Sequence, residues 1–544
     1  MTRSANGPRK LLLFRHKRIG IGVAAGSALA VSPMCSRRVE FVPSSPRLRL
    51  FLTCWLVYVM HFATDFVREH YLVLSMVEDQ SYALDKYYGM HVDIFQNPPE
   101  AKVQGAHHGA NPGMSMVGAI PYVFARPLVD IVVARELAGR KARGDTAVAV
   151  YQDNRPRRVA FYQKVRQLGL DVRFGLVSAI TTVFCMAPLS AASAVLMFTL
   201  IGAMGAGQRT SLALSLLYAF GTPVFFRTAY LNQNLGLGIF SFVAFVLIWN
   251  PGPISKWTAS TRFFLAGLLG GLACLSDYSG FIMAGLLGFY AWWRAADDEG
   301  ALRGFRRSLW YLMGTLPGIL MLFQYQWASF GNPFYPPQHW MAPVQWIEVG
   351  YKGVGGLSAE LFRMLLIDSR FGLLIAMPIA ILAIASPFLV RRRLIALPMR
   401  ELMVCLGLSF ALILFFSTVQ YTRLQWVTGI RYLAAIFPFV FVAALPALLA
   451  LPRVLGYGLA FLSFVVSWSI AMVRSQGTVF ENIQRVLIEG FQLPWLTVIT
   501  KMSAQYLPWY TGKLSALPIF VIVGLMVWLI WTINTPWKRP DIAS

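Results

Sequence analysis

Apolar stretches close to 20 residues long recur along most of this 544-residue chain. A helix of about that length crosses the hydrocarbon core of a bilayer. The composition agrees, because 57% of the residues are hydrophobic and only 13% are charged, whereas a soluble domain carries about a quarter charged residues. The sequence therefore predicts an all-α polytopic membrane protein with no soluble domain of independent size.

The apolar runs and the positions of basic residues together predict twelve transmembrane spans. Cytosolic loops are enriched in Lys and Arg. The two short apolar runs at 262–276 and 278–293 are read as separate spans. One fused span would place the basic clusters Arg306-Arg307 and Arg391-Arg392-Arg393 outside the cell. The predicted spans lie near 48–66, 178–204, 211–226, 231–249, 262–276, 278–293, 309–329, 371–390, 402–419, 429–451, 454–472 and 515–533.

This topology predicts a multi-pass protein of the plasma (inner) membrane with both termini in the cytosol. Residues 1–47 are predicted to form a basic, poorly ordered cytosolic extension, and residues 536–544 a cytosolic tail. The membrane domain between them is predicted to span 48–535. Its extracytoplasmic loops are placed at 67–174, 330–370 and 473–514.

The first loop is long enough to carry helices that lie on the membrane surface. A candidate helix at 114–134 contains Pro121, Arg126, Pro127 and Asp130, so we expect it at the interface rather than across the bilayer. The basic stretch 135–173 falls outside in this topology, which loops longer than about 60 residues tolerate.

The net charge of +24 is explained by basic residues in the N-terminal segment and in the loops. This distribution suits contact with anionic lipid headgroups, so membrane lipid is an expected partner and nucleic acid is not. The five cysteines show no paired or metal-type spacing. Most lie inside apolar runs, where we expect them to pack.

Two carboxylates lie at and just beyond the end of the first predicted span. Asp65 and Glu69 are four residues apart, so one helix would place both on the same face at the membrane surface. A carboxylate partly shielded from water has a raised pKa and can act as a general base. The alternative is that both are ordinary interfacial charges, with Glu69 capping a helix or pairing with Arg68 or Lys86. Spacing alone favours that alternative.

A second polar segment runs from His107-His108 through Asn111 to the turn Pro112-Gly113. A turn of this kind exposes main-chain amides, which suit a phosphate. The adjacent histidines have no third ligand at metal-binding spacing, so no metal site is predicted here.

Taken in order, these segments resemble the GT-C superfamily of polyprenyl-phosphate-sugar-dependent membrane glycosyltransferases, which includes protein O-mannosyltransferases and lipid A aminoarabinose transferases. The resemblance covers about residues 48–451. Besides the acid after the first span and the Pro-Gly turn, it rests on Tyr71-Leu72, Tyr230-Leu231-Asn232-Gln233-Asn234, Ser276-Asp277-Tyr278, Phe330-Gly331-Asn332-Pro333 and Gly429-Ile430-Arg431-Tyr432.

The resemblance implies an inverting transfer of a sugar from a polyprenyl phosphate to an extracytoplasmic acceptor of unknown class. Where the family often has Asp-Glu, this chain has Arg68-Glu69, so Glu69 is the first candidate for the base and Asp65 the second. A cation would stabilise the departing lipid phosphate. The expected substrate-binding residues are Arg431 first, then Lys352, Arg370 and His107, together with His108, Asn111, Asp277, Tyr278 and Tyr432.

Purely structural interpretations of Arg431 and Asp277 also stay open. Arg431 would be a snorkelling arginine at a helix end, and Asp277 would cap the helix that follows it. Two other functions also stay open: a lipid or solute transporter, including a lipid-linked-sugar flippase, and an inactive GT-C-like scaffold. Most acids lie at loop edges on one predicted face, which favours an interfacial enzyme over a transporter. The sequence leaves the cofactor open between none and a divalent metal.

Overall fold

The computed structural model describes residues 45–142, 144, 156–342, 346–389, 394–502 and 516–532. These residues are mostly helical, as predicted. Their one sheet is an antiparallel pair, β1 (Ile94–Gln96) and β2 (Ala106–His108), with Phe95 opposite His107. Almost all of the predicted basic extension, the predicted tail, residues 503–514 and the cluster Arg391-Arg392-Arg393 lie outside the described residues.

Each of the stretches predicted as spans contains a helix. Up to residue 249 the helices are α1 (Pro46–Met60), α2 (Arg68–Leu74), η1 (Ser75–Asp79), η2 (Asp85–Tyr87), α3 (Gly113–Ala142), α4 (Pro156–Gln167), α5 (Asp171–Thr181), η3 (Thr182–Met186), α6 (Ala187–Ala203), α7 (Gln208–Phe220), α8 (Val224–Arg227) and α9 (Gln233–Trp249). Beyond it they are α10 (Ala259–Ser276), α11 (Ser279–Glu299), α12 (Ala301–Phe330), α13 (Pro337–Trp340), α14 (Ala359–Ile367), α15 (Leu373–Ala376), η4 (Pro378–Ile381), α16 (Leu382–Leu389), α17 (Met399–Thr418), η6 (Gln420–Arg423), η7 (Tyr432–Ile436), α18 (Phe437–Ala450), α19 (Arg453–Val473), α20 (Val479–Glu489), α21 (Pro494–Met502) and α22 (Leu517–Thr532).

Six helical segments among the described residues are long and apolar enough to cross a membrane. Five of them fall on predicted spans, and the chain therefore carries several helices suited to a membrane protein. The six segments are Gly113–Ala142, Asp171–Ala203, Ala259–Ser276, Met399–Thr418, Tyr432–Ala450 and Arg453–Val473.

The remaining segment, α3, contains the stretch 114–134, which is predicted from sequence to lie at the interface. It is one continuous helix of 30 residues with Pro121 and Pro127 inside it. Its exposed side chains include Phe124, Leu128 and Ile131. Length and composition alone thus place α3 with the candidate spans, although its prolines and charges had suggested a surface helix.

Helices α9 and α18 are enclosed by the rest of the described chain. Both are apolar all round, the pattern of a helix that is buried on every side. Gly238 of α9 permits a close approach, because a Cβ at this position would lie 2.6 Å from the Cα of Ala435 in η7. The start of α9 is therefore held firmly against the segment that follows Arg431.

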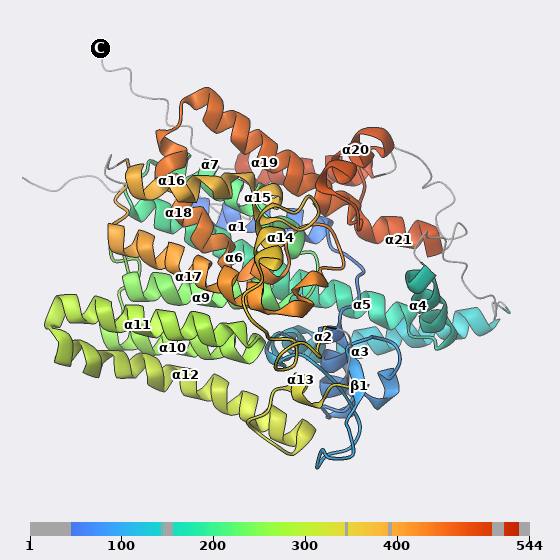
Figure 1. The fold of residues 1–544 in the computed structure, drawn as a ribbon. Coiled ribbons are helices and arrows are strands. Elements are labelled where there is room, and N and C mark those ends of the chain that lie inside the picture. The colour runs from blue at the N-terminus through green and yellow to red at the C-terminus, as the bar shows by residue number, and fades with distance from the viewer. Residues whose placement is uncertain are drawn as a thin grey trace, which may run out of the picture. The chain divides into compact units, whose positions relative to one another are not determined.

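Helices α10, α11 and α12 pack side by side (Figure 1). Gly267 and Gly271 of α10 meet Gly314 and Gly318 of α12, and each pair is four residues apart. A Cβ on Gly267 would lie 2.0 Å from the main-chain oxygen of Tyr311. This small-xxx-small pattern on both helices explains how their backbones come so close.

Segments that follow α1, α17 and α19 meet one another and the segment before α9. Main-chain hydrogen bonds join them: Ala63 N donates to Ala229 O (2.7 Å), Thr428 N to Ser475 O (2.9 Å) and Gly429 N to Arg370 O (2.7 Å). Because these segments all lie at helix ends, they form a layer of connecting chain at one end of the helices. The candidate site lies in this layer.

Candidate functional site

A cavity of about 380 Å³ opens among these connecting segments. Its volume falls within the range of roughly 300–1,000 Å³ that is typical of small-molecule sites. The described residues that line it are 65–69, 90–93, 157–158, 161–162, 230–234, 425–427, Arg431, Arg474 and Gln476.

Charged side chains dominate the polar part of this lining. Five arginines face three carboxylates, which leaves an excess of two positive charges among the described lining residues. The arginines are Arg68, Arg157, Arg158, Arg431 and Arg474, and the acids are Asp65, Glu69 and Asp93. Such a cavity favours an anionic ligand.

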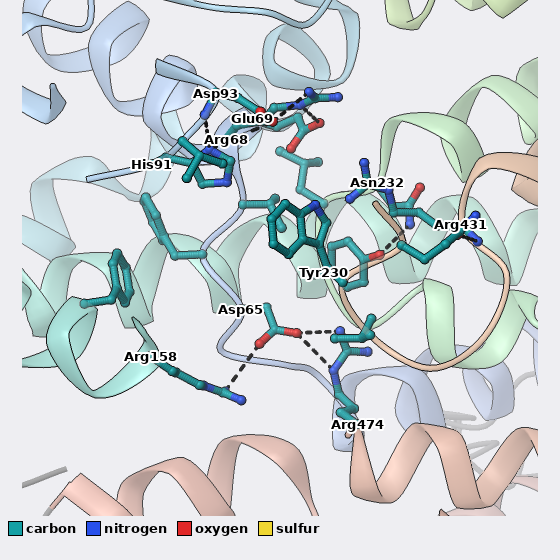
Figure 2. Close-up of a pocket in the computed structure, with 18 of the residues that line it drawn as sticks. Asp65, Arg68, Glu69, His91, Asp93, Arg158, Tyr230, Asn232, Arg431 and Arg474 are labelled. Carbon is teal, nitrogen blue, oxygen red and sulfur yellow. Dashed lines mark hydrogen bonds and ion pairs between the residues drawn. The ribbon is translucent and has the colours of Figure 1, made fainter. Parts of the chain in front are cut away.

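Asp65 lies between two of the arginines (Figure 2). Its Oδ2 accepts from Nη2 (2.5 Å) and Nε (3.2 Å) of Arg474, and its Oδ1 lies 3.4 Å from Nη2 of Arg158. The expectation that Asp65 and Glu69 share a helix face is wrong, because α1 ends at Met60 and α2 begins at Arg68. Asp65 instead lies in the extended connection between the two helices.

Glu69 belongs to a second cluster, centred on Arg68. Nε of Arg68 lies 3.3 Å from Oε1 of Glu69, and its Nη1 donates to Oδ2 of Asp93 at 3.0 Å. Glu69 is buried, and its Oε2 makes no hydrogen bond within the described part of the chain. Of the alternatives raised from sequence, Glu69 pairs with Arg68, whereas Lys86 pairs with Asp79.

Asp93 and His91 complete this cluster. Burial alone would raise the pKa of Asp93, but the guanidinium of Arg68 outweighs it, so the pKa lies below its usual value and the carboxylate is ionised. Burial lowers the pKa of His91, which is therefore neutral near pH 7. Nδ1 of His91 accepts from the main-chain N of Asp93 at 3.1 Å, so the ring hydrogen is on Nε2.

Arg431 lies on the side of the cavity formed by Tyr230 and Asn232 (Figure 2). Its Nη2 donates to the hydroxyl of Tyr432 at 3.0 Å, and its guanidinium lies over the ring of Tyr432. No carboxylate among the described residues pairs with Arg431. Its guanidinium can therefore meet an anion in the cavity without breaking an ion pair to a described carboxylate.

The two clusters make the cavity electrically asymmetric. Around Arg68, one cation faces the two carboxylates of Glu69 and Asp93. Around Asp65, the described arginines Arg158 and Arg474 both pair with the carboxylate, and Arg474 lies over the ring of Tyr230 on the Arg431 side. One side of the cavity is thus richer in positive charge, and the other side is richer in negative charge.

Several residues expected at the site lie elsewhere. His107, His108 and Asn111 do not line the cavity. His107 packs against Phe330, and burial lowers its pKa, so it is neutral near pH 7 rather than a cation for phosphate. Asn111 donates to the main-chain oxygen of Cys274 at 2.9 Å.

The Pro-Gly turn also has a packing role. A Cβ on Gly113 would lie 2.6 Å from the main-chain N of Ser276, so glycine lets the start of α3 approach the turn between α10 and α11. The expectation that this turn holds a phosphate is not supported, because neither it nor the histidines before it reach the cavity.

Asp277 lies one side chain behind the cavity wall. Its Oδ2 accepts from Nε2 of Gln233, a lining residue, at 2.7 Å. Its Oδ1 accepts from the main-chain N (2.9 Å) and the hydroxyl (2.7 Å) of Ser279. Asp277 therefore caps the start of α11, which is the alternative role raised from sequence. Tyr278 bonds to Gln326 and does not line the cavity.

Two further cations proposed for phosphate do not reach the cavity. Lys352 lies in the turn where Tyr351 and Val354 pair. Arg370 donates from Nε to the main-chain oxygen of Gln476 at 3.0 Å and lies over the ring of Phe371. Arg370 thus braces a lining segment from outside.

Sequence reasoning missed several lining residues. It treated Arg68 as a departure from a motif and as an alternative partner of Glu69, and it did not consider His91, Asp93, Arg158 or Arg474. A signal existed for Arg474, which directly follows a predicted span at the same predicted membrane face as Asp65.

No protein-family model, curated protein or solved structure matches the chain. No group of His, Cys, Asp and Glu side chains in the described ranges is arranged to hold a metal ion.

Proposed function

We propose that this chain is a membrane glycosyltransferase, which transfers a sugar from a polyprenyl phosphate to an extracytoplasmic acceptor with inversion. The observation that carries the proposal is one cavity in which a buried carboxylate, Glu69, lies with an excess of arginines. In this proposal twelve segments span the plasma membrane, both termini are cytosolic, and the cavity opens on the extracytoplasmic side.

The charge of the cavity fits the charge change of such a reaction. The donor is a phosphodiester with one negative charge, whereas the departing polyprenyl phosphate is a monoester that carries about −1.5 to −2 near pH 7. Negative charge therefore grows on the phosphate as the bond to the sugar breaks. Arginines lower the barrier to the reaction if they attract the more negative phosphate of the transition state more strongly than the donor phosphate. Arg431 is the first candidate for this role because no carboxylate among the described residues pairs with it.

Glu69 is the proposed base. It takes the proton from the acceptor hydroxyl while the hydroxyl oxygen forms a bond to the anomeric carbon, and the phosphate leaves with the electron pair of the broken C–O bond. Asp65 suits this role less, because both of its carboxylate oxygens face guanidinium groups. The phosphate would lie on the side of Arg431 and Arg474, and the acceptor on the side of Glu69.

The test uses purified protein in nanodiscs with a panel of polyprenyl phosphates that carry different radiolabelled sugars. Membrane extract supplies the acceptor, and both release and transfer of sugar are scored. We expect one donor to be consumed, and loss of the general base in Glu69→Gln to slow that turnover by about 10²–10⁴-fold. Glu100→Gln is the matched control, because Glu100 is an exposed acid of the same predicted loop outside the cavity lining.

Two results would contradict the proposal. Folded wild-type protein that binds and consumes none of the donors would favour an inactive scaffold. Movement of an intact lipid-linked sugar across proteoliposomes without cleavage of its C–O bond would indicate a transporter instead.

A further inference from the structure

Arg227, at the end of α8, is fully buried and does not touch the cavity. All three of its nitrogens donate hydrogen bonds. Nε donates to Ile430 O (2.9 Å), Nη2 to Gly429 O (2.5 Å) and Nη1 to the hydroxyl of Tyr230 (2.8 Å). One guanidinium thus joins two segments that line different parts of the cavity wall.

The charge of Arg227 has no carboxylate beside it among the described residues. A buried charge without an ionic partner is costly, even when its hydrogen bonds are satisfied. The arginines Arg431 and Arg474 interact with it electrostatically and add repulsion. Arg227 thus adds positive charge directly behind the cavity wall, where it bonds to the lining residue Tyr230.

The segment that Arg227 holds is unusual in conformation. Gly429 has φ +90°, and a Cβ there would lie 2.6 Å from the ring of Phe226, so the chain passes tightly against the end of α8. Arg431 follows two residues later, and its main-chain N donates to Oε1 of Gln425 at 2.9 Å. The carbonyls that Arg227 binds therefore belong to the two residues directly before Arg431.

The opposite partner of Arg227 is also engaged. The hydroxyl of Tyr230 accepts from Nδ2 of Asn232 at 3.0 Å, and the ring lies under the guanidinium of Arg474. The three bonds of Arg227 thus connect the segment of Arg431 with the segment of Tyr230 and Asn232. A fixed relation between these walls fixes where an anion can bind.

We propose that Arg227 is a positioning residue of an anion site. It holds the main chain at Gly429 and Ile430 so that Arg431 faces the cavity, and its own water-excluded charge strengthens the attraction for a lipid phosphate. The inference rests on the proposed function in one respect, namely that the anion is the phosphate of a polyprenyl carrier.

The test compares Arg227→Gln and Arg227→Lys with wild-type protein in nanodiscs. The first readout is hydrogen–deuterium exchange of residues 424–433, and the second is the affinity for undecaprenyl phosphate. Arg209→Gln is the control, because Arg209 is an exposed arginine at the start of α7 outside the cavity lining.

Arg227→Gln should raise exchange in 424–433 and weaken undecaprenyl phosphate binding by about tenfold, because both the charge and the forked donor are lost. Arg227→Lys keeps the charge but lacks the fork, so exchange should rise as in the Gln variant while affinity falls only about threefold. A merely structural arginine would not separate the two readouts in this way. The control should leave both unchanged.

Exchange and affinity within twofold of wild type in Arg227→Gln would overturn the proposal. If that variant does not fold, Arg227→Lys takes its place, and exchange in 424–433 within twofold of wild type in that variant would then overturn it. A wild-type protein that does not bind undecaprenyl phosphate would refute the proposed function and the role of the charge, while exchange in the Lys variant still decides whether Arg227 holds the segment.

Discussion

Asp65 and Arg474, 409 positions apart in the chain, are joined by two hydrogen bonds to one carboxylate oxygen. This pair ties the segment after α1 to the end of α19 and forms part of the cavity wall. Arg474 has φ +45°, which is uncommon for a residue other than glycine. Its bonds to Asp65 and to the main-chain oxygen of Phe226 (3.1 Å) hold it in that conformation.

The pair predicts a specific pattern of stability changes. Arg474 is 7% exposed and Asp65 26%, so a buried guanidinium without its carboxylate costs more than the reverse. Asp65→Asn should therefore lower the unfolding midpoint more than Arg474→Gln. The double variant should lose less than the sum, with a coupling of about 0.5–3 kcal/mol. Thermal unfolding in detergent measures this, and additive losses would show that the pair does not stabilise the fold.

His70, next to Glu69, predicts acid sensitivity. Burial lowers its pKa to about 3. Its Nδ1 accepts from Val67 N (3.1 Å), and its Nε2 pairs with Thr181 Oγ1 (3.0 Å), whose own hydrogen goes to Val177 O. The ring is therefore neutral in the folded protein.

The sign of this pH dependence follows from proton uptake. The unfolded chain protonates His70 near pH 6.5, whereas the folded protein does so only near pH 3, so the unfolded state binds more protons between these values. The free energy of unfolding should thus fall as pH decreases below about 6.5. The unfolding midpoint of His70→Gln, measured between pH 7.5 and 5, should fall less steeply than that of wild type. Parallel curves would contradict this origin of the acid sensitivity.

The glycine contact between α10 and α12 predicts intolerance to a single methyl group. A Cβ on Gly318 would lie 2.3 Å from the carbonyl carbon of Gly271, and neither backbone can move without separating the helices. Gly318→Ala should cost about 1–3 kcal/mol or more, which is typical of overpacking. Gly285→Ala on α11 is the control, because open space surrounds that position. Equal unfolding midpoints for the two variants would contradict the close approach.

The helices were predictable from the sequence because each apolar run is a local property of the chain. The ends of the helices were less predictable from the sequence. The run near 48–66 predicted a helix through Asp65, but α1 ends at Met60. A run shows where apolar residues are, whereas the end of a helix depends on its contacts. Here Ala63 N bonds to Ala229 O rather than to a main-chain oxygen of α1.

The site was only partly predictable for a related reason. Glu69 stood out because it lies in a short polar segment beside an apolar run, and Arg431 because the segment 429–432 resembles a family motif. Asp93 and Arg474 did not, since their relation to the site comes from long-range pairs with Arg68 and Asp65. A single sequence does not show which distant residues come together in the fold, so it does not reveal such pairs. For the same reason His107, Lys352 and Arg370 drew attention as charges or rings in loops, although none lines the cavity.

The most direct test of the central claim is a single-turnover measurement with the donor that wild-type protein consumes. Glu69→Gln and Asp65→Asn are compared after both are shown to be folded by their elution and unfolding midpoints. We expect Glu69→Gln to lose about 10²–10⁴-fold in the rate of sugar transfer, and Asp65→Asn to lose about tenfold or less because it only loosens Arg474 and Arg158. A rate that survives in Glu69→Gln and is abolished in Asp65→Asn would contradict the account.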